Sequence, residues 1–157
     1  MKTNGNRVWW QAHDGPVRDI VFIDGDKIAS GGDDGRVKIW ERIEGRLLIS
    51  LLGHSGGVTC LAYHSGAHIL VSGSEDRTIK IWRPVPTWQC MGELKGNGDT
   101  VSALRFLSET LVVSGCFDGK IRVYDLEKGE ICKYLDHGDS SKVTCLLILG
   151  NNRLLAG

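Results

Sequence analysis

Short runs in which apolar and polar residues alternate recur along the chain, and residues that favour turns precede each run. In "SGSEDRTIKIW", residues 72–82, Ile79 and Ile81 would lie on one face of an extended segment, whereas Lys80 and Trp82 would lie on the other. Alternation with a period of two, combined with β-branched and aromatic residues, predicts β-strands. The period of an amphipathic helix is absent throughout, so the sequence predicts an all-β protein.

The same pattern returns at a fixed interval. It occurs as "SGGDDGRVKIW" from Ser30 and as "SGCFDGKIRVY" from Ser114, so the serines at 30, 72 and 114 lie 42 residues apart. An earlier strand-like run in each copy begins at a valine, and these valines are Val17, Val58, Val101 and Val143. A second run ends at the serine, and a fourth follows in "GRLLISL", "TWQCMGEL" and "GEICKYL". Each copy is therefore expected to contain four strands.

A four-stranded unit of about 42 residues with apolar side chains on both faces must be covered on both sides, which is typical of a β-propeller blade. We expect antiparallel blades arranged as an incomplete propeller of about three and a half blades. The expected segments are a leading outer strand at 1–12, complete repeats at 13–53, 54–95 and 96–135, and a truncated repeat at 136–157.

The chain resembles the WD-repeat family over nearly its whole length. The resemblance rests on Gly53-His54 at a repeat start, Ser-Gly at 30, 72 and 114, Asp at 34, 76 and 118, and the aromatic residue ending each third strand. It implies that a His, a Ser, an Asp and a Trp of one repeat form a hydrogen-bonded network. The residues expected in these networks are His13, Ser30, Asp34, Trp40, His54, Ser72, Asp76, Trp82, Ser114 and Asp118.

Some positions depart from the family pattern. Asn97 stands where the third repeat should have its His, Tyr124 replaces Trp, and Ala156 occupies the Ser position of the fourth repeat. His137 lies two residues earlier than the register predicts. The networks of the third and fourth repeats are therefore expected to be incomplete or absent. The resemblance also implies a ring of about seven blades, which fifteen expected strands cannot close, so we expect a fragment of a longer protein.

Composition narrows the classes of partner. The chain has 19 basic and 19 acidic residues, so no net positive field would attract nucleic acid or an anionic membrane. The start "MKTNGNRVWW" lacks the apolar core of a signal peptide, and the longest apolar run, "CLLIL", is too short to cross a bilayer. We therefore expect a cytoplasmic or nuclear protein that binds neither nucleic acid nor membrane.

The cysteine, histidine, serine and aspartate residues of the chain favour a structural role over a catalytic one. Five cysteines without a CxxC pair favour free thiols, and His64 and His68 fall in a turn, so neither a metal nor another cofactor is expected. Ser, His and Asp of one network suggest a hydrolase triad. One triad per repeat would make several active sites, and no GxSxG motif is present, so we expect no catalytic residues.

A rigid array of repeats without reactive groups is typical of a platform for other proteins. We expect a non-catalytic scaffold or adaptor that binds protein or peptide partners, and self-association through unclosed blade edges. The alternatives are the substrate-recognition part of a multidomain ubiquitin-ligase-type adaptor and a propeller-based enzyme. The resemblance implies a docking face at the loops before each first strand and the turns before each third strand, where this chain has Arg18, Asp33, Thr59, Glu75, Thr100, Phe117 and Lys142.

Overall fold

The computed structural model describes residues 2–4, 7–9, 11–135, 141–149 and 153–157. All regular structure within these residues is β, which confirms the predicted fold class. The strands of the first half are β1 (Lys2–Asn4), β2 (Arg7–Trp9), β3 (Val17–Ile23), β4 (Lys27–Gly32), β5 (Val37–Glu41), β6 (Arg46–Leu51), β7 (Val58–His64) and β8 (Ile69–Ser74). Those of the second half are β9 (Ile79–Pro84), β10 (Trp88–Leu94), β11 (Val101–Phe106), β12 (Leu111–Cys116), β13 (Ile121–Asp125), β14 (Glu130–Leu135), β15 (Leu146–Leu149) and β16 (Arg153–Ala156).

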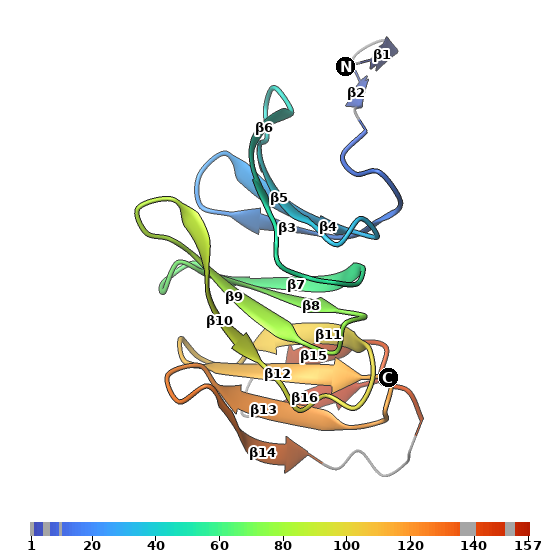
Figure 1. Ribbon diagram of the computed structural model, residues 1–157, viewed down its shortest axis with the longest axis vertical. Coiled ribbons are helices and arrows are strands. Elements are labelled where there is room, and N and C mark those ends of the chain that lie inside the picture. Colours follow the sequence, from blue (N-terminus) through green and yellow to red (C-terminus); the bar gives the residue numbers. More distant parts are fainter. Residues whose placement is uncertain (1, 5–6, 10, 136–140, 150–152) are drawn as a thin grey trace.

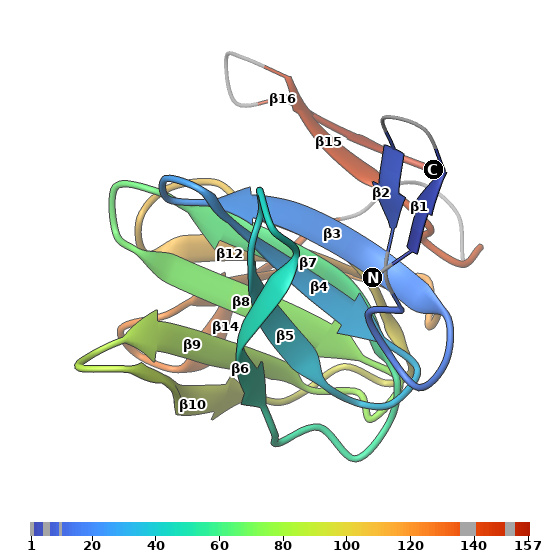
Figure 2. The same cartoon turned by 90° about the horizontal axis from the view of Figure 1, so that it is seen from above.

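Three complete blades follow one another along the chain. Each is a four-stranded antiparallel sheet whose strands lie in chain order: β3 to β6 in blade 1, β7 to β10 in blade 2 and β11 to β14 in blade 3. A half-blade, β15 paired with β16, contacts blade 3 through β11. The blades stack face to face in an open array (Figure 1), and the view from above shows their sheets overlapping one another (Figure 2).

The first twelve residues differ from the expected single outer strand. Lys2–Asn4 and Arg7–Trp9 form two short strands that pair with each other, with Lys2 opposite Trp9. An outer strand needs a third strand beside it to satisfy its backbone groups. No described residue supplies one here, so the segment pairs with itself.

Tight turns with unusual backbone conformations lead into each third strand. Gly35, Arg77 and Gly119 occupy equivalent positions and have φ angles of 72°, 69° and 74°. Glycine adopts this left-handed conformation freely, whereas a residue with a Cβ adopts it at a cost. The sequence pattern Asp-Gly therefore marks the turn in blades 1 and 3, and Arg77 keeps the same geometry in blade 2.

The hydrophobic core lies between the blades. Each Ser-Gly glycine of one blade packs against the first valine of the next, and a Cβ added to Gly31, Gly73 or Gly115 would lie 2.5 Å from that valine's Cγ1. The contacted Val58, Val101 and Val143 are 0%, 0% and 1% exposed. Only glycine permits this approach, so the 42-residue spacing of Ser-Gly sets how closely the blades stack.

Candidate functional site

A hydrogen-bonded chain joins four side chains in each of the first two blades. In blade 2 the Trp82 Nε1–H donates to Ser72 Oγ over 2.8 Å, and Ser72 Oγ lies 2.7 Å from His54 Nε2. His54 Nδ1 lies 2.7 Å from an Asp76 carboxylate oxygen. Blade 1 repeats the distances, with 2.8 Å from Trp40 to Ser30, 2.7 Å from Ser30 to His13 and 2.7 Å from His13 to Asp34.

The direction of donation follows from chemistry. The indole can only donate, so the serine hydroxyl donates onward to His Nε2, and His Nδ1–H donates to the carboxylate. Burial lowers the pKa of His54, although Asp76 opposes the shift, so the neutral ring is favoured. Burial disfavours the charge of Asp76, but hydrogen bonds from Thr78 and His54 outweigh it and lower the pKa of that carboxyl.

Blade 3 holds its aspartate differently. Ser114 Oγ donates to Asn97 Oδ1 over 3.3 Å, but no imidazole of the described residues contacts Asp118. The Arg122 guanidinium takes that place and donates to both Asp118 oxygens, at 3.0 and 2.5 Å. Burial opposes ionisation of Asp118, yet Arg122 and the neighbouring backbone N–H groups hold its pKa far below the usual range. Among the described residues the buried Tyr124 hydroxyl has no hydrogen-bond partner.

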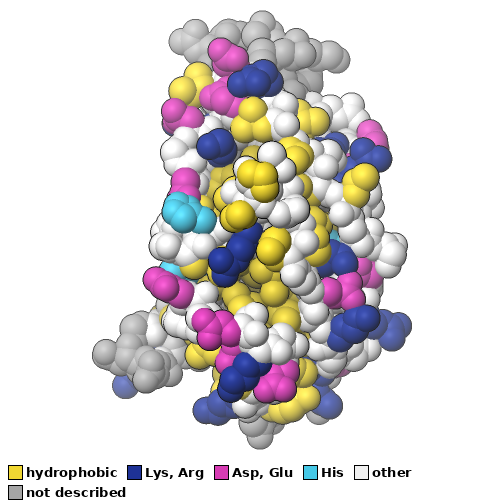
Figure 3. Space-filling model, turned by 60° about the vertical axis from the view of Figure 1, so that its left-hand side comes forward, with side chains coloured by type: hydrophobic (Ala, Val, Ile, Leu, Met, Phe, Trp, Pro, Cys, Tyr) yellow, Lys and Arg dark blue, Asp and Glu magenta, His cyan; other side chains and the backbone are white. Residues whose placement is uncertain are grey.

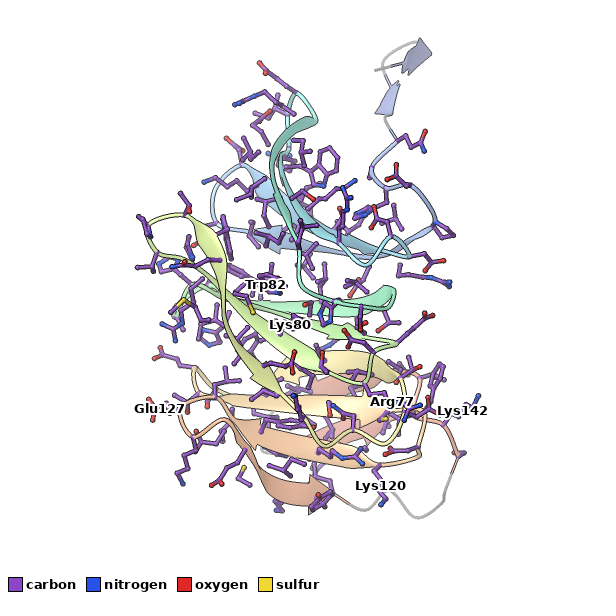
Figure 4. The ribbon with its side chains drawn as sticks, viewed as in Figure 1. Arg77, Lys80, Trp82, Lys120, Glu127 and Lys142 are labelled. Atoms are coloured by element: carbon purple, nitrogen blue, oxygen red, sulfur yellow. The ribbon has the colours of Figure 1, made fainter. Side chains whose placement is uncertain are left out.

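In each complete blade the second residue of the third strand is a buried basic residue, which the sequence pattern was not used to predict. Lys38, Lys80 and Arg122 are 8%, 8% and 3% exposed and lie 42 residues apart. Lys38 donates to the Ala12 carbonyl oxygen at 2.8 Å, whereas Lys80 pairs with Glu93 of the neighbouring strand. In Figure 4, Lys80 and Trp82 lie on the sheet of blade 2, inside the stack. A basic residue two positions before each terminal aromatic was the signal available in the sequence.

Seven loops and turns gather at one edge of the stack, and we call this surface the loop face. Arg77 and Lys142 lie on it in Figure 4, whereas Glu127 lies at the opposite edge. It comprises the loops 12–16, 53–57, 95–100 and 141–142 and the turns 33–36, 75–78 and 117–120.

Three equivalent residues are held in the same way on the loop face. The N–H groups of Asp33, Glu75 and Phe117 each donate over 3.0 Å to the carbonyl oxygen of the residue before that blade's first valine. The acceptors are Pro16, Gly57 and Thr100. Because the backbone is fixed identically, the three side chains occupy corresponding places on neighbouring blades.

The charges of blades 1 and 2 are partly paired with each other. Arg18 donates to both Asp33 oxygens, at 2.5 and 2.8 Å, and this pairing lowers the pKa of Asp33. Glu75 adds to the negative potential at Arg18, and a Cβ on Gly57 would lie 3.3 Å from a Glu75 carboxylate oxygen. The three charged residues therefore form one connected group on the loop face.

On blade 3 the loop face carries an aromatic side chain. The Phe117 ring is half-buried, and the exposed Lys142 of the next repeat places its Nζ 4.9 Å from the ring centroid, a cation–π contact. The Thr100 N–H donates to Asp99 at 2.6 Å, and the carbonyl of Thr100 holds Phe117. Phe117 and Lys142 thus form one platform, which sequence reasoning placed on the same face without bringing them into contact.

The half-buried Thr59 joins two neighbouring blades. Its hydroxyl lies 3.0 Å from the Gly73 carbonyl oxygen and also contacts the Val101 carbonyl oxygen of blade 3. Ser102 makes the equivalent contacts, with the Gly115 carbonyl at 3.0 Å and with the Val143 carbonyl. The hydroxyl after the valine of blades 2 and 3 therefore joins neighbouring blades, a contact that the sequence pattern did not predict.

Two histidines, His64 at the end of β7 and His68 in the turn that follows it, also join blades. Asp24 of blade 1 accepts a hydrogen bond from the Tyr63 hydroxyl at 2.5 Å and contacts His68, both in blade 2. His64 packs its ring 5.3 Å from that of Phe106 in blade 3. Among the described residues, no three or more potential ligands are grouped to hold a metal ion, and no helix could span a membrane. His137 lies outside the described residues.

The comparison with protein families covers most of the chain. Residues 6–41, 45–83 and 88–125 match the family model described as "WD domain, G-beta repeat". Among solved structures, the designed protein Ika4 has a TM-score of 0.82 and 33% identity, covering 99% of this chain and 92% of that one. The designed protein Ika8 has a TM-score of 0.78 and 34% identity, covering 92% of this chain and 43% of that one.

The curated relatives are much longer proteins. Nuclear distribution protein nudF of Aspergillus niger is 36% identical over 69% of this chain and 26% of its own length. Autophagy-related protein 16 of Arabidopsis thaliana is 28% identical over 87% and 30%. Human F-box/WD repeat-containing protein 10 is 33% identical over 82% and 12%. The chain therefore spans between 12% and 30% of the length of these relatives.

Proposed function

The chain belongs to the WD-repeat family, and from that premise we propose that it is a non-catalytic scaffold module whose loop face binds protein or peptide partners. The observation that carries the proposal is the Phe117–Lys142 platform, which presents an aromatic ring and a cation together. Aromatic residues, phenylalanine among them, are enriched in protein–protein interfaces. The rigid stack below holds this platform at fixed geometry.

The chemistry of the loop face suggests what a partner should offer. The Phe117 ring can cover an apolar side chain, and the Lys142 ammonium can reach a carboxylate beside it. Asp33 is already paired with Arg18, so it adds little attraction for a basic group. We therefore expect a peptide with an apolar residue next to an acidic one.

The absence of a free nucleophile in the networks supports a non-catalytic role. Ser30 and Ser72 are 2% and 0% exposed, and each hydroxyl oxygen accepts from a tryptophan while lying against a histidine. A serine used in this way cannot reach a substrate carbonyl. The networks instead join the second and third strands of a blade to the loop before its first strand.

Charge and thiol chemistry support the remaining parts of the proposal. Basic and acidic side chains are interspersed on the face shown in Figure 3, without a field of one sign that would attract nucleic acid or an anionic membrane. All five cysteines are free, as in a reducing compartment. We accordingly assign the module to the cytoplasm or the nucleus, with protein partners alone.

A second candidate function follows from one relative. The human relative is named for an F-box as well as WD repeats, which favours a role as the substrate-recognition part of a multidomain ubiquitin-ligase-type adaptor. Such a role would use the same loop face. It differs in requiring another domain in the same protein.

Binding of selected peptides tests the proposed function. Peptides are selected from a random library on the wild-type chain, and their affinities are then measured for Phe117→Ser. We expect at least a roughly tenfold loss of affinity with a nearly unchanged melting temperature, because the ring is a platform and not core. Ile43→Ser is the matched control, since Ile43 is 68% exposed in the turn equivalent to that of Glu127, away from the loop face. Equal affinities of both variants would refute the assignment.

A further inference from the structure

The turn between the third and fourth strands is capped by a carboxylate in blades 1 and 3. In blade 1 the Glu41 carboxylate accepts hydrogen bonds from the N–H groups of Ile43 and Glu44, at 2.9 and 2.7 Å. In blade 3 Asp125 accepts in the same way from the N–H groups two and three residues later, at 2.9 and 3.1 Å. An acidic residue at this position therefore satisfies the backbone of the turn.

The same turn of blade 2 is built differently. Arg83 stands at the acidic position, and a guanidinium cannot accept a hydrogen bond. The residues that follow are Pro84, Val85 and Pro86, so the second of the two N–H groups is missing. Gln89 of the opposite strand instead donates its side-chain N–H to the Val85 carbonyl oxygen. We call residues 83–86 the proline turn.

The proline turn presents an apolar and rigid surface. Val85 is 58% exposed, and Pro84 and Pro86 are exposed on either side of it. Trp88 lies opposite Pro84 in the strand register, and its half-buried side chain packs on the core between blades 1 and 2. Proline has no side-chain entropy to lose, so contacts to this surface cost little ordering.

Arg83 adds a cation beside this apolar surface. Its side chain is exposed, and none of the described residues pairs with its guanidinium. Arg42 in the turn of blade 1, by contrast, donates to Asp26 at 3.0 Å. A guanidinium presents its N–H donors in a rigid plane that matches the two oxygens of a carboxylate. The proline turn therefore offers ion pairing and apolar contact together.

The proline turn lies at the edge of the stack opposite the loop face. Glu127, which takes the place of Val85 in blade 3, lies at that edge in Figure 4. The turn between β9 and β10 projects there in Figure 1, and Figure 3 brings this side forward, with hydrophobic side chains along its middle and Lys or Arg among them. Blade 2 lies between two complete blades, so the turn is exposed although both neighbours are in place.

We propose that the proline turn is a second docking site, which binds an acidic segment of a partner protein in which a carboxylate stands next to an aromatic residue. The carboxylate pairs with the Arg83 guanidinium, which has no partner within the chain. The flat aromatic ring covers Pro84, Val85 and Pro86 and removes their apolar surface from water. The module then holds two proteins, one on each of two opposite edges of a rigid stack.

Peptides selected from a random library on the Phe117→Ser variant test the proposal, because that variant lacks the aromatic platform of the loop face. We expect the selected peptides to share an acidic residue next to Trp, Tyr or Phe. Adding Arg83→Glu should weaken their binding by at least about tenfold. Arg42→Glu is the matched control, since it reverses the same charge in the turn of blade 1, and should leave the affinity unchanged. Failure to select any peptide, peptides without the acidic residue, or equal effects of the two charge reversals would overturn the proposal.

Exchanging the charges gives the sharper test. A selected peptide whose acidic residue is replaced by Lys should bind Arg83→Glu better than it binds the chain with Arg83, because the ion pair is restored in reverse. Val85→Ser should also weaken the selected peptides, whereas Ile43→Ser, in the same turn of blade 1, should not. None of these variants should lower the melting temperature, since each side chain is exposed. If the exchanged pair fails to bind, Arg83 does not hold the carboxylate, and the proposed function of the loop face is unaffected.

Discussion

At the scale of single residues, the same aspartate position is stabilised in two ways. His54 and the Thr78 hydroxyl hold Asp76 in blade 2, at 2.7 Å each, whereas a guanidinium holds Asp118 in blade 3. Each arrangement gives a buried carboxylate enough hydrogen bonds to remain charged. The loss of the histidine in blade 3 is therefore compensated within the same blade by Arg122.

Removing the carboxylate of blade 2 tests the network. Asp76→Ala leaves His54 Nδ1 without its acceptor in a buried site, so we expect the free energy of unfolding to fall by about 1 to 3 kcal/mol. Urea denaturation followed by tryptophan fluorescence measures the change. The control is Asp26→Ala, which removes a 61% exposed partner of Arg42 and should cost less than about 1 kcal/mol. Equal losses for both variants would argue against a structural network.

We expect the Arg122 guanidinium of blade 3 to contribute more to the free energy of unfolding than the Asp76 carboxylate of blade 2. Arg122→Ala leaves the Asp118 charge partly buried without its partner, which should cost about 3 to 5 kcal/mol, and the Tyr134 ring loses its cation as well. Adding Asp118→Asn should recover part of the loss, because the uncompensated charge is then gone. Lys128→Ala, at an exposed ion pair of 3.7 Å, is the control. A double variant no more stable than Arg122→Ala would contradict this account.

At the scale of elements, close approach of β8 and β11 depends on a glycine. In Gly73→Ala the new Cβ would lie 2.5 Å from Val101 Cγ1 and 2.7 Å from Cys60 Sγ, so blades 2 and 3 must separate. We expect a loss of about 1 to 3 kcal/mol, measured by thermal or urea unfolding. Gly92→Ala on β10 is the control, because its Cβ would meet only Ile81 Cδ1, at 3.6 Å. Equal losses of stability in Gly73→Ala and Gly92→Ala would contradict the idea that close approach of the blades requires a glycine.

At the scale of the whole molecule, stability should fall in acid in two steps. The folded pKa of His54 lies below its ordinary value of 6.5, so the unfolded chain takes up its proton first and stability declines as the pH drops below about 6.5. The pKa values of Asp34, Asp76 and Asp118 lie below 3.8, so their contribution is complete above that pH and is lost further down. Melting temperatures across the acid range measure both steps.

A variant separates the two steps of the acid transition. His54→Gln removes the group responsible for the first step, so its melting temperature, although lower at neutral pH, should change less between about pH 7 and 5. The second step should remain, because the aspartates of the other blades are unchanged. Parallel curves for the variant and the wild type would assign the first step to another group.

The sequence by itself determined the repeat and the four strands of each complete blade. These follow from local periodicity, because alternation sets the face of every side chain and a 42-residue period carries that register from blade to blade. Ser72 and Trp82, ten residues apart, lie on adjacent strands of one sheet and meet as the register requires. Asn97 and Tyr124 could also be recognised from the sequence as departures, because the first two repeats have His and Trp at these positions.

Only the tertiary structure decided which partners the side chains meet across blades. Thr59 contacts a carbonyl of the next blade, Asp24 contacts the turn of another, and Phe117 packs beneath Lys142. These contacts join residues of different blades. Their geometry therefore depends on how closely and at what angle two sheets stack. The hairpin of β1 and β2 has the same origin, because an extended segment forms whichever strand pairing its surroundings offer.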